Sequence, residues 1–296
     1  MKGKKKNRKK KRTTRSASTV RLRLPGKTVR LNRTYIIASI TAVAAFLVIA
    51  TFALNYVPGT YHGLGKSSSV PLSEYQRSGF RTGSDGLLKY SDSRYRSIAG
   101  IDVSEFQGSI DWEKVRKSGV KFAMIRLGYS GSATGQISMD TRFRENISGA
   151  RKAGIEVGVY FFSQAKTTEE AVSEAKYVIR HIRMHGVTYP VAYDMEPVSG
   201  SRISGLTKKQ KTRIADAFCT IIRRNGYKPM VYGNPSWLSN QIDRSYLTKY
   251  GTWLAHYSGT NYTDYSYSYK MWQYSDRGKI SGISGKVDLD IYFIKK

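Results

Sequence analysis

The chain has 296 residues, of which 40% are hydrophobic and 12% aromatic, and its 50 Lys and Arg against 21 Asp and Glu give a formal net charge of +29. The single cysteine, Cys219, excludes a disulfide scaffold and a cysteine-ligated zinc site, and the ordinary apolar content excludes a wholly disordered chain. Residues 1–34 contain 15 basic and no acidic residues. About half of the net charge therefore belongs to an N-terminal tail.

The N-terminal segments predict a membrane protein. Residues 1–34 have too little apolar content to fold, which predicts a disordered cytoplasmic tail that contacts anionic inner-leaflet lipid, with nucleic acid an unlikely partner. Residues 35–57 carry no charge, and a helix of that length would span roughly 34 Å, which predicts a single transmembrane signal-anchor helix. The basic tail before this helix predicts that the N-terminus stays in the cytoplasm and the bulk of the chain lies outside the cell membrane.

A cleaved signal peptide is the alternative for the apolar segment. The apolar stretch is longer than the hydrophobic region of an ordinary signal peptide, and the basic region before it is long, so an uncleaved anchor is favoured. Residues 58–97 are rich in Gly and Ser and show no sustained period, which predicts an extracytoplasmic linker.

Beyond the linker, short apolar runs alternate with amphipathic stretches. The candidate strands are 97–103, 121–127, 156–162, 189–196, 229–233, 252–257, 270–274 and 287–293, and the candidate helices are 111–117, 140–153, 168–185, 208–225 and 236–250. Eight strands favour a closed barrel over an open doubly wound sheet, which remains the alternative. The last three strands have no room for helices between them. The expected fold is therefore α/β, an incomplete β/α barrel of five β/α units followed by three β-strands, over residues 98–296.

Carboxylates follow three of the predicted strands. Asp102 follows the first, Asp194 and Glu196 the fourth, and Asp288 and Asp290 lie in the last. Functional side chains of β/α barrels lie at the C-terminal ends of strands, and residues i and i+2 of a strand face the same way. Asp194 and Glu196 should therefore point together into a site.

This arrangement of acids predicts acid catalysis by a protonated carboxyl. Like charges held close in a partly dry site resist simultaneous ionisation, so one carboxyl keeps its proton and can act as an acid. Glycoside hydrolysis needs such a protonated carboxyl beside an ionised one. A divalent-metal site with oxygen ligands is the rival interpretation of the same acids. We expect no cofactor and no metal.

Aromatic side chains near the strand ends support a sugar ligand, because flat apolar rings with polar tips suit stacking on pyranose faces. The candidates for substrate binding are Tyr160, Phe162, Tyr232, Trp253, Trp272 and Tyr274.

Several ordered motifs resemble one family across the predicted outer domain. They are Gly-Ile-Asp102-Val-Ser with Phe-Gln-Gly108, Val-Gly-Val-Tyr160-Phe-Phe162, Asp194-Met-Glu196, Trp253-Leu-Ala-His-Tyr257, Met-Trp-Gln-Tyr274 and Val-Asp288. On these motifs, residues 99–293 resemble the glycoside hydrolase family 25 lysozymes, the Chalaropsis-type N-acetylmuramidases. One departure is Arg126-Leu-Gly-Tyr129, where many members have Lys-Xaa-Thr/Ser-Glu-Gly, and this puts fine substrate preference in doubt.

The resemblance implies a lysozyme that hydrolyses the β-1,4 bond between N-acetylmuramic acid and N-acetylglucosamine in peptidoglycan. It implies Glu196 as proton donor, Asp194 as nucleophile or as the group that positions the substrate acetamido, and Asp102 and Asp288 as supporting acids. Combined with the predicted anchor, it suggests a catalytic domain that faces the cell wall and remodels it locally. The alternatives are a catalytically silent peptidoglycan-binding module and another peptidoglycan glycosidase, such as a glucosaminidase.

Overall fold

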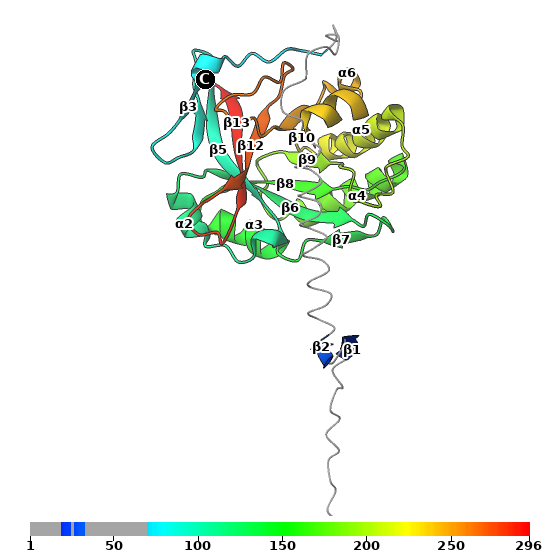
Figure 1. Cartoon of the computed structure of the whole chain (residues 1–296). Coiled ribbons are helices and arrows are strands. Elements are labelled where there is room, and N and C mark those ends of the chain that lie inside the picture. The colour runs from blue at the N-terminus through cyan, green and yellow to red at the C-terminus, as the bar shows by residue number, and fades with distance from the viewer. Residues whose placement is uncertain (1–18, 25–26, 33–69) are drawn as a thin grey trace, which may run out of the picture. The chain divides into compact units, whose positions relative to one another are not determined.

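The computed structural model describes residues 19–24, 27–32 and 70–296 of the chain (Figure 1). Two compact units separate, one over residues 1–60 and one over residues 61–296. In the first unit, β1 (Thr19–Leu24) pairs antiparallel with β2 (Lys27–Asn32). The expectation of disorder throughout residues 1–34 is therefore wrong for these two strands. Their sequences, TVRLRL and KTVRLN, alternate apolar and polar residues at the period of a strand, and Pro25 and Gly26 between them favour a turn.

The predicted single-pass membrane localisation requires correction. Among the residues that the structure describes, none of the helices combines the length and the apolar character that crossing a bilayer requires. The longest of them, α5 (Lys208–Arg224), has 17 residues, many of them Lys or Arg. The expected span over residues 35–57 lies outside the described residues.

The second unit is built on eight strands that close into a barrel. They are β5 (Tyr95–Val103), β6 (Phe122–Ser130), β8 (Glu156–Phe162), β9 (Val191–Asp194), β10 (Pro229–Gly233), β11 (Gly251–Ala255), β12 (Met271–Gly278) and β13 (Val287–Lys295). The pairing of β5 with β6 closes the ring, and β7 (Ile137–Met139) extends β6 as a hairpin. The predicted eight-strand α/β barrel is thus confirmed.

One strand of the barrel departs from the parallel arrangement. β13 runs antiparallel to both β12 and β5, whereas every other neighbouring pair in the ring is parallel. Only a short loop joins β12 to β13, and a parallel connection would need a crossover of a dozen or more residues. The last strand therefore returns along the barrel in the opposite direction.

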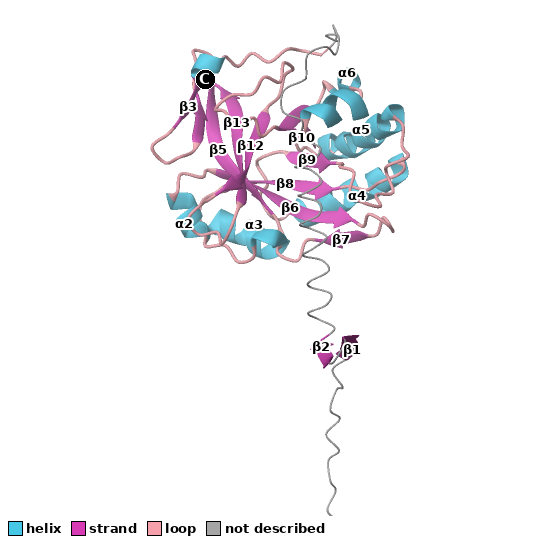
Figure 2. Cartoon of the chain, viewed as in Figure 1, coloured by secondary structure: helices cyan, strands magenta, loops and turns pink. Residues whose placement is uncertain are grey.

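The helices lie outside one part of the barrel (Figures 1 and 2). They are α2 (Trp112–Lys117), α3 (Phe143–Lys152), α4 (Thr168–Ile182), α5, and the short α6 (Arg244–Leu247), which follows a π-helical turn over Trp237–Gln241. Thr167 accepts a hydrogen bond from Glu170 N at the start of α4, and Thr207 forms a full capping box with Gln210 at the start of α5. The five predicted helical regions are therefore present, although the last one is broken into two short turns.

The core has two parts, because successive side chains of each strand point to opposite faces. Inside the barrel lie mostly large apolar side chains, namely Phe122, Met124, Ala192, Met230, Tyr232, Trp253, Ala255 and Met271. Between the barrel and its cover lies a larger cluster that includes Ile101, Phe161, Tyr193, Leu254, Trp272 and Phe293. The side chains of this larger cluster point outward from the strands. The residues that alternate with them along each strand face the barrel interior, and Asp102 and Asp194 are among these.

Residues 70–97 form part of the folded unit. β3 (Phe80–Thr82) and β4 (Leu88–Tyr90) form a hairpin beside β5 and β13 (Figure 1). The Phe80 ring packs edge-on against Trp272, and Tyr75 stacks on Phe293 with ring centroids 3.8 Å apart. The expectation of a loose linker is therefore wrong over this range. α2 follows β5, but no helix lies between β12 and β13, and aromatic side chains of residues 70–97 cover part of the outer face of these two strands instead.

If this cover is structural, removing an apolar side chain from it should destabilise the whole unit. Leu88 is 3% exposed, so Leu88→Ala should lower the free energy of unfolding by about 2–4 kcal/mol. Lys89→Ala is the matched control on the same strand, since its ion pair with Asp85 is exposed and should contribute less than about 1 kcal/mol. Denaturant unfolding of both variants measures the difference. Equal and small effects would mean that the hairpin is not part of the core.

Candidate active site

The predicted acids meet at one end of the barrel. Asp102 lies at the end of β5, Asp194 ends β9, and Glu196 follows two residues later. Because β13 runs antiparallel, its beginning lies at the same end, and Asp288 is the direct cross-strand neighbour of Asp102. Asp290, which the sequence left undecided, follows on the same face of β13. Five carboxyls from three strands are thus gathered at the C-terminal end of the parallel strands.

Asp194 and Glu196 form a tightly coupled pair. Asp194 is 6% exposed, whereas Glu196 is partly exposed to solvent. Burial, the charge of Glu196 and a hydrogen bond between the two carboxyls raise the pKa of Asp194 well above its ordinary range, and burial raises the pKa of Glu196 to about 7. Two carboxyls that share a hydrogen bond must hold a proton between them. The pair therefore carries one acid and one carboxylate near neutral pH.

A second pair lies deeper. Asp290 is fully buried, and its Oδ1 accepts a hydrogen bond of 2.8 Å from Trp253 Nε1. Burial raises the pKa of Asp290 to about 8, and burial together with the charge of Asp290 raises the pKa of Asp102. Burial and the charge of Asp102 also raise the pKa of Asp288. This end of the barrel therefore retains protons that isolated carboxyls would have lost.

The buried amide of Gln273 connects the acids to the tyrosines. Its Nε2 donates to Asp102 Oδ2 at 2.7 Å, and its Oε1 accepts from the hydroxyls of Tyr232 at 2.9 Å and Tyr257 at 2.6 Å. An amide in this position has a fixed orientation, because only its nitrogen can donate to a carboxylate. Gln273 thereby fixes the orientation of Asp102. The sequence predictions missed this residue, although it lies in the Met-Trp-Gln-Tyr motif.

The positive charge of Arg126 acts on Asp194. Its guanidinium donates to Asp140 Oδ2 at 2.7 Å and to Glu105 Oε1 at 3.0 Å, which fixes the position of this side chain on β6. The positive charge of Arg126 acts to lower the pKa of Asp194 against the larger effects of burial and Glu196. This effect is the smallest of those that act on Asp194, so the pKa of Asp194 stays well above its ordinary range.

The backbone carbonyl of Glu196 is held by a buried polar network. Gln164 Nε2 donates to this carbonyl at 2.8 Å, and the backbone nitrogen of Gln164 donates to Ser130 Oγ at 2.7 Å. Ser130 in turn donates to Glu174 on α4 at 2.6 Å, and Ser163 donates to the other oxygen of Glu174 at 2.7 Å. Buried polar groups that are fully hydrogen-bonded stiffen their surroundings. The network therefore fixes the position of the segment that carries Glu196.

The predicted aromatic contacts divide into two groups. Tyr160 and Phe162 are partly exposed near the acids, and Phe162 pairs with Asp194 across β8 and β9. Tyr232 is nearly buried with its hydroxyl on Gln273, so sugar contact through its ring stays a prediction.

Three aromatic predictions require correction. Trp272 and Tyr274 lie on the outer face of β12, because Gln273 between them faces inward. Trp272 is fully buried, and the hydroxyl of Tyr274 accepts from the backbone nitrogen of Leu88 at 3.2 Å. Trp253 points inward but is 1% exposed and donates to Asp290. Hence none of the three offers a free ring face to a sugar.

Over residues 19–24, 27–32 and 70–296, no group of three or more His, Cys, Asp and Glu side chains is arranged to hold a metal ion. Every acid of the site instead has a neighbouring carboxyl or a hydrogen-bond donor, as described above. This arrangement suits proton transfer.

Comparisons with known proteins show the family of this chain. Residues 101–283 match the model of glycosyl hydrolases family 25, so the chain belongs to this family and is a glycoside hydrolase. It is 30% identical over 200 residues to Lysozyme M1 of Streptomyces globisporus, covering 64% of this chain and 66% of that one.

Solved structures show the same fold. The modular autolysin LytC of Streptococcus pneumoniae is similar with a TM-score of 0.60 and 26% identity, over 72% of this chain and 52% of that one. A family 25 glycosyl hydrolase from Bacillus anthracis is similar with a TM-score of 0.57 and 25% identity, over 69% of this chain and 92% of that one. The chain thus spans about half of LytC.

The buried carboxyl of Glu174 makes a testable contribution to stability. Burial raises its pKa from 4.5 to about 7, so the folded state holds this proton more tightly than the unfolded state does. The stabilisation is complete below about pH 4.5 and is lost as the pH rises through 7, a change of about 3 kcal/mol for this shift. Glu174→Gln should remove this part of the pH dependence in unfolding measurements across that range.

Glu113→Gln, at an exposed position of α2, is the control and should leave the pH dependence as in the wild type. If Glu174→Gln and the wild type lose stability equally between pH 4.5 and 7, the carboxyl of Glu174 does not hold a proton in the folded state.

Proposed function

We propose that the chain is an N-acetylmuramidase that hydrolyses the β-1,4 bond between N-acetylmuramic acid and N-acetylglucosamine in peptidoglycan. The observation that carries the proposal is the coupled pair of Asp194 and Glu196, which holds one proton at the C-terminal end of the barrel. The similarity to Lysozyme M1 and to LytC, which was also solved with a synthetic peptidoglycan ligand, supports peptidoglycan as the substrate.

Glu196 is the proton donor in this proposal. It is the more exposed member of the pair, so its carboxyl can reach the glycosidic oxygen of a substrate outside the barrel. The proton passes from Glu196 to the leaving oxygen as the bond to the anomeric carbon breaks. Asp194, whose ionised form Arg126 favours, stabilises the positive charge that develops at the anomeric centre, either as nucleophile or by positioning the acetamido group.

Asp102 and Asp288 support this chemistry. They face each other across β5 and β13, and Asp288 is partly exposed beside the pair. Their charges raise the pKa of their neighbours, and the hydrogen bond from Gln273 holds Asp102 in place. Tyr160 and Phe162, partly exposed at the same end, are the side chains that we propose contact the sugar rings.

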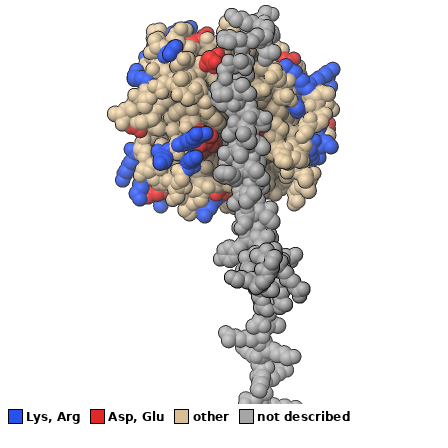
Figure 3. Space-filling model, in the orientation of Figure 1, with Lys and Arg blue, Asp and Glu red and all other residues tan. Residues whose placement is uncertain are grey.

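Positive charge on the surface favours binding to an anionic cell wall. Residues 98–296 contain 29 Lys and Arg and 18 Asp and Glu, and Figure 3 shows the basic side chains spread around the visible face of the molecule. A distributed positive field raises the local concentration of a polyanion without defining a particular contact. Binding to the wall is therefore expected to be nonspecific in part, whereas cleavage depends on the carboxyl pair.

The bond that is cleaved identifies the activity. The protein should be incubated with purified peptidoglycan, and the new reducing ends identified by mass spectrometry after borohydride reduction. Reduced muramic acid ends are the expected result. Reduced glucosamine ends would contradict the proposal in favour of a glucosaminidase, and binding without new ends would contradict it in favour of a silent binding module.

Glu196→Gln should abolish the new reducing ends, because the amide keeps the shape of the side chain and cannot donate a carboxyl proton. We expect kcat to fall by at least about 100-fold, in the range that general acid catalysis contributes. The wild type should lose activity as the pH rises through about 7, where the pair releases its proton. Glu113→Gln, at an exposed position of α2, is the matched control. Full activity of Glu196→Gln would remove Glu196 from the mechanism.

A further inference from the structure

A second hollow lies at the opposite end of the barrel from the carboxyls. It has a volume of about 450 Å³ and is lined by the first residues of β10 and β11, by Lys270 just before β12, and by Tyr292 and Lys295 near the end of β13. Another wall is formed by Pro71, Leu72, Glu74, Tyr75 and Tyr95. These positions are the N-terminal ends of the parallel strands, so we call this hollow the floor pocket. It is separate from the proposed catalytic site.

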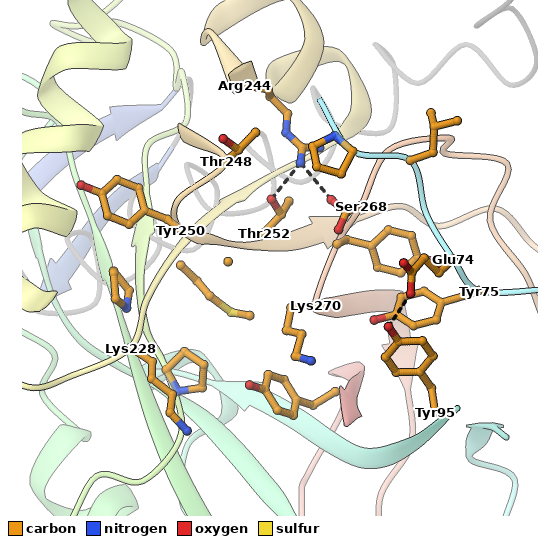
Figure 4. Close-up of a pocket in the computed structure, with 18 of the residues that line it drawn as sticks. Glu74, Tyr75, Tyr95, Lys228, Arg244, Thr248, Tyr250, Thr252, Ser268 and Lys270 are labelled. Carbon is orange, nitrogen blue, oxygen red and sulfur yellow. Dashed lines mark hydrogen bonds between the residues drawn. The ribbon is translucent and has the colours of Figure 1, made fainter. Parts of the chain in front are cut away.

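Four basic side chains line the floor pocket, namely Lys228, Lys270, Lys295 and Arg244. Figure 4 labels Lys228, Lys270 and Arg244. None of the three lysines has an acidic partner within ion-pair distance among the described residues. Burial and the positive charges of Lys295 and Lys228 lower the pKa of Lys270. The lysines are therefore close enough to repel one another.

The carboxylate of Glu74 and the guanidinium of Arg244 in the pocket already have partners within the protein. Glu74, the acid of the lining, accepts from the hydroxyl of Tyr95 and pairs with Arg94 at 3.4 Å. The guanidinium of Arg244 donates to the Tyr265 hydroxyl, to Thr252 Oγ1 and to the carbonyl of Ser268, all of which are neutral. Its positive charge is thus uncompensated, although most of its hydrogen bonds are used.

This arrangement selects one chemical class of ligand. A planar carboxylate is best matched by a free guanidinium fork, which Arg244 does not offer. Ammonium groups act as point charges that can approach a compact anion from several directions, as lysines do around phosphate. The tyrosine rings of the lining, including Tyr292 beneath Lys270, provide apolar faces for the carbon skeleton that carries such an anion.

We propose that the floor pocket binds a phosphate group, carried by a phosphodiester-linked chain of polyols or sugars, through Lys228, Lys270 and Lys295. Binding there would attach the domain to a phosphate-bearing polymer while the carboxyl end of the barrel remains free for its own substrate. The proposal does not depend on which glycosidic bond the enzyme cleaves.

The test compares two triple variants of the full chain with equal net charge. Lys228→Gln, Lys270→Gln and Lys295→Gln remove the ammonium groups of the pocket. The control, Lys152→Gln, Lys176→Gln and Lys209→Gln, removes three exposed lysines of α3, α4 and α5. Both variants keep the basic N-terminal tail, so nonspecific attraction by the tail is the same in each. The probes are a short poly(glycerol phosphate) oligomer and inorganic phosphate, at constant ionic strength.

We expect the pocket variant to bind the oligomer about tenfold more weakly than the wild type, and the control variant to stay within about twofold, because only the former loses charge-assisted contacts. If inorganic phosphate displaces the oligomer from the wild type but not from the pocket variant, the proposal is supported and phosphate alone is a sufficient ligand. Pocket-dependent binding of the oligomer alone would support the polymer as the source. Equal weakening in both variants, or no binding by the wild type, would overturn it. Unchanged unfolding and glycosidase activity verify that the pocket variant is folded.

Discussion

The burial of several carboxyls at one end of a small barrel is the constraint on which the rest of the site depends. Removing negative charges from water is costly unless they are paired or keep their protons. In this structure Asp194 hydrogen-bonds to Glu196, and Asp102 to Asp290, so each pair can hold a proton. The remaining charge is stabilised by neighbouring side chains: Trp253 donates to Asp290, Gln273 donates to Asp102, and the positive charge of Arg126 acts on Asp194.

The direction of the last strand connects the fold to this chemistry. Because β13 runs antiparallel, its first residues lie beside the last residues of β5, and Asp288 faces Asp102. A parallel strand would have placed these acids at the opposite end of the barrel. The same reversal leaves no crossover helix between β12 and β13, and residues 70–97 pack against the outer face of these strands instead. The aromatic hairpin and the supporting acids are two consequences of one short loop.

Most of the fold was predictable because its signals are local. Alternating apolar runs, helix caps and the spacing of these elements along the chain predict the eight strands and the main helices. Because side chains alternate in direction along a strand, Asp194 and Glu196 are predicted to lie on one face. The same alternation places Trp272 and Tyr274 on the outer face of β12, since Gln273 between them faces inward. Residues 70–97 lacked a period because their contacts come from scattered aromatic rings. The network from Gln164 to Glu174 joins β6, β8 and α4, and such long-range contacts leave no local pattern.

A direct titration of the buried carboxyls tests whether they share protons at neutral pH. Carbon-13 carboxyl shifts of Asp and Glu should be followed by NMR from pH 3 to 9, with Glu196→Gln and Asp290→Asn used to assign the coupled signals. The Glu196 signal should titrate near pH 7 and the Asp290 signal near pH 8. Titration of all the carboxyls of the site below about pH 5, as for exposed carboxyls, would show that they do not share protons at neutral pH.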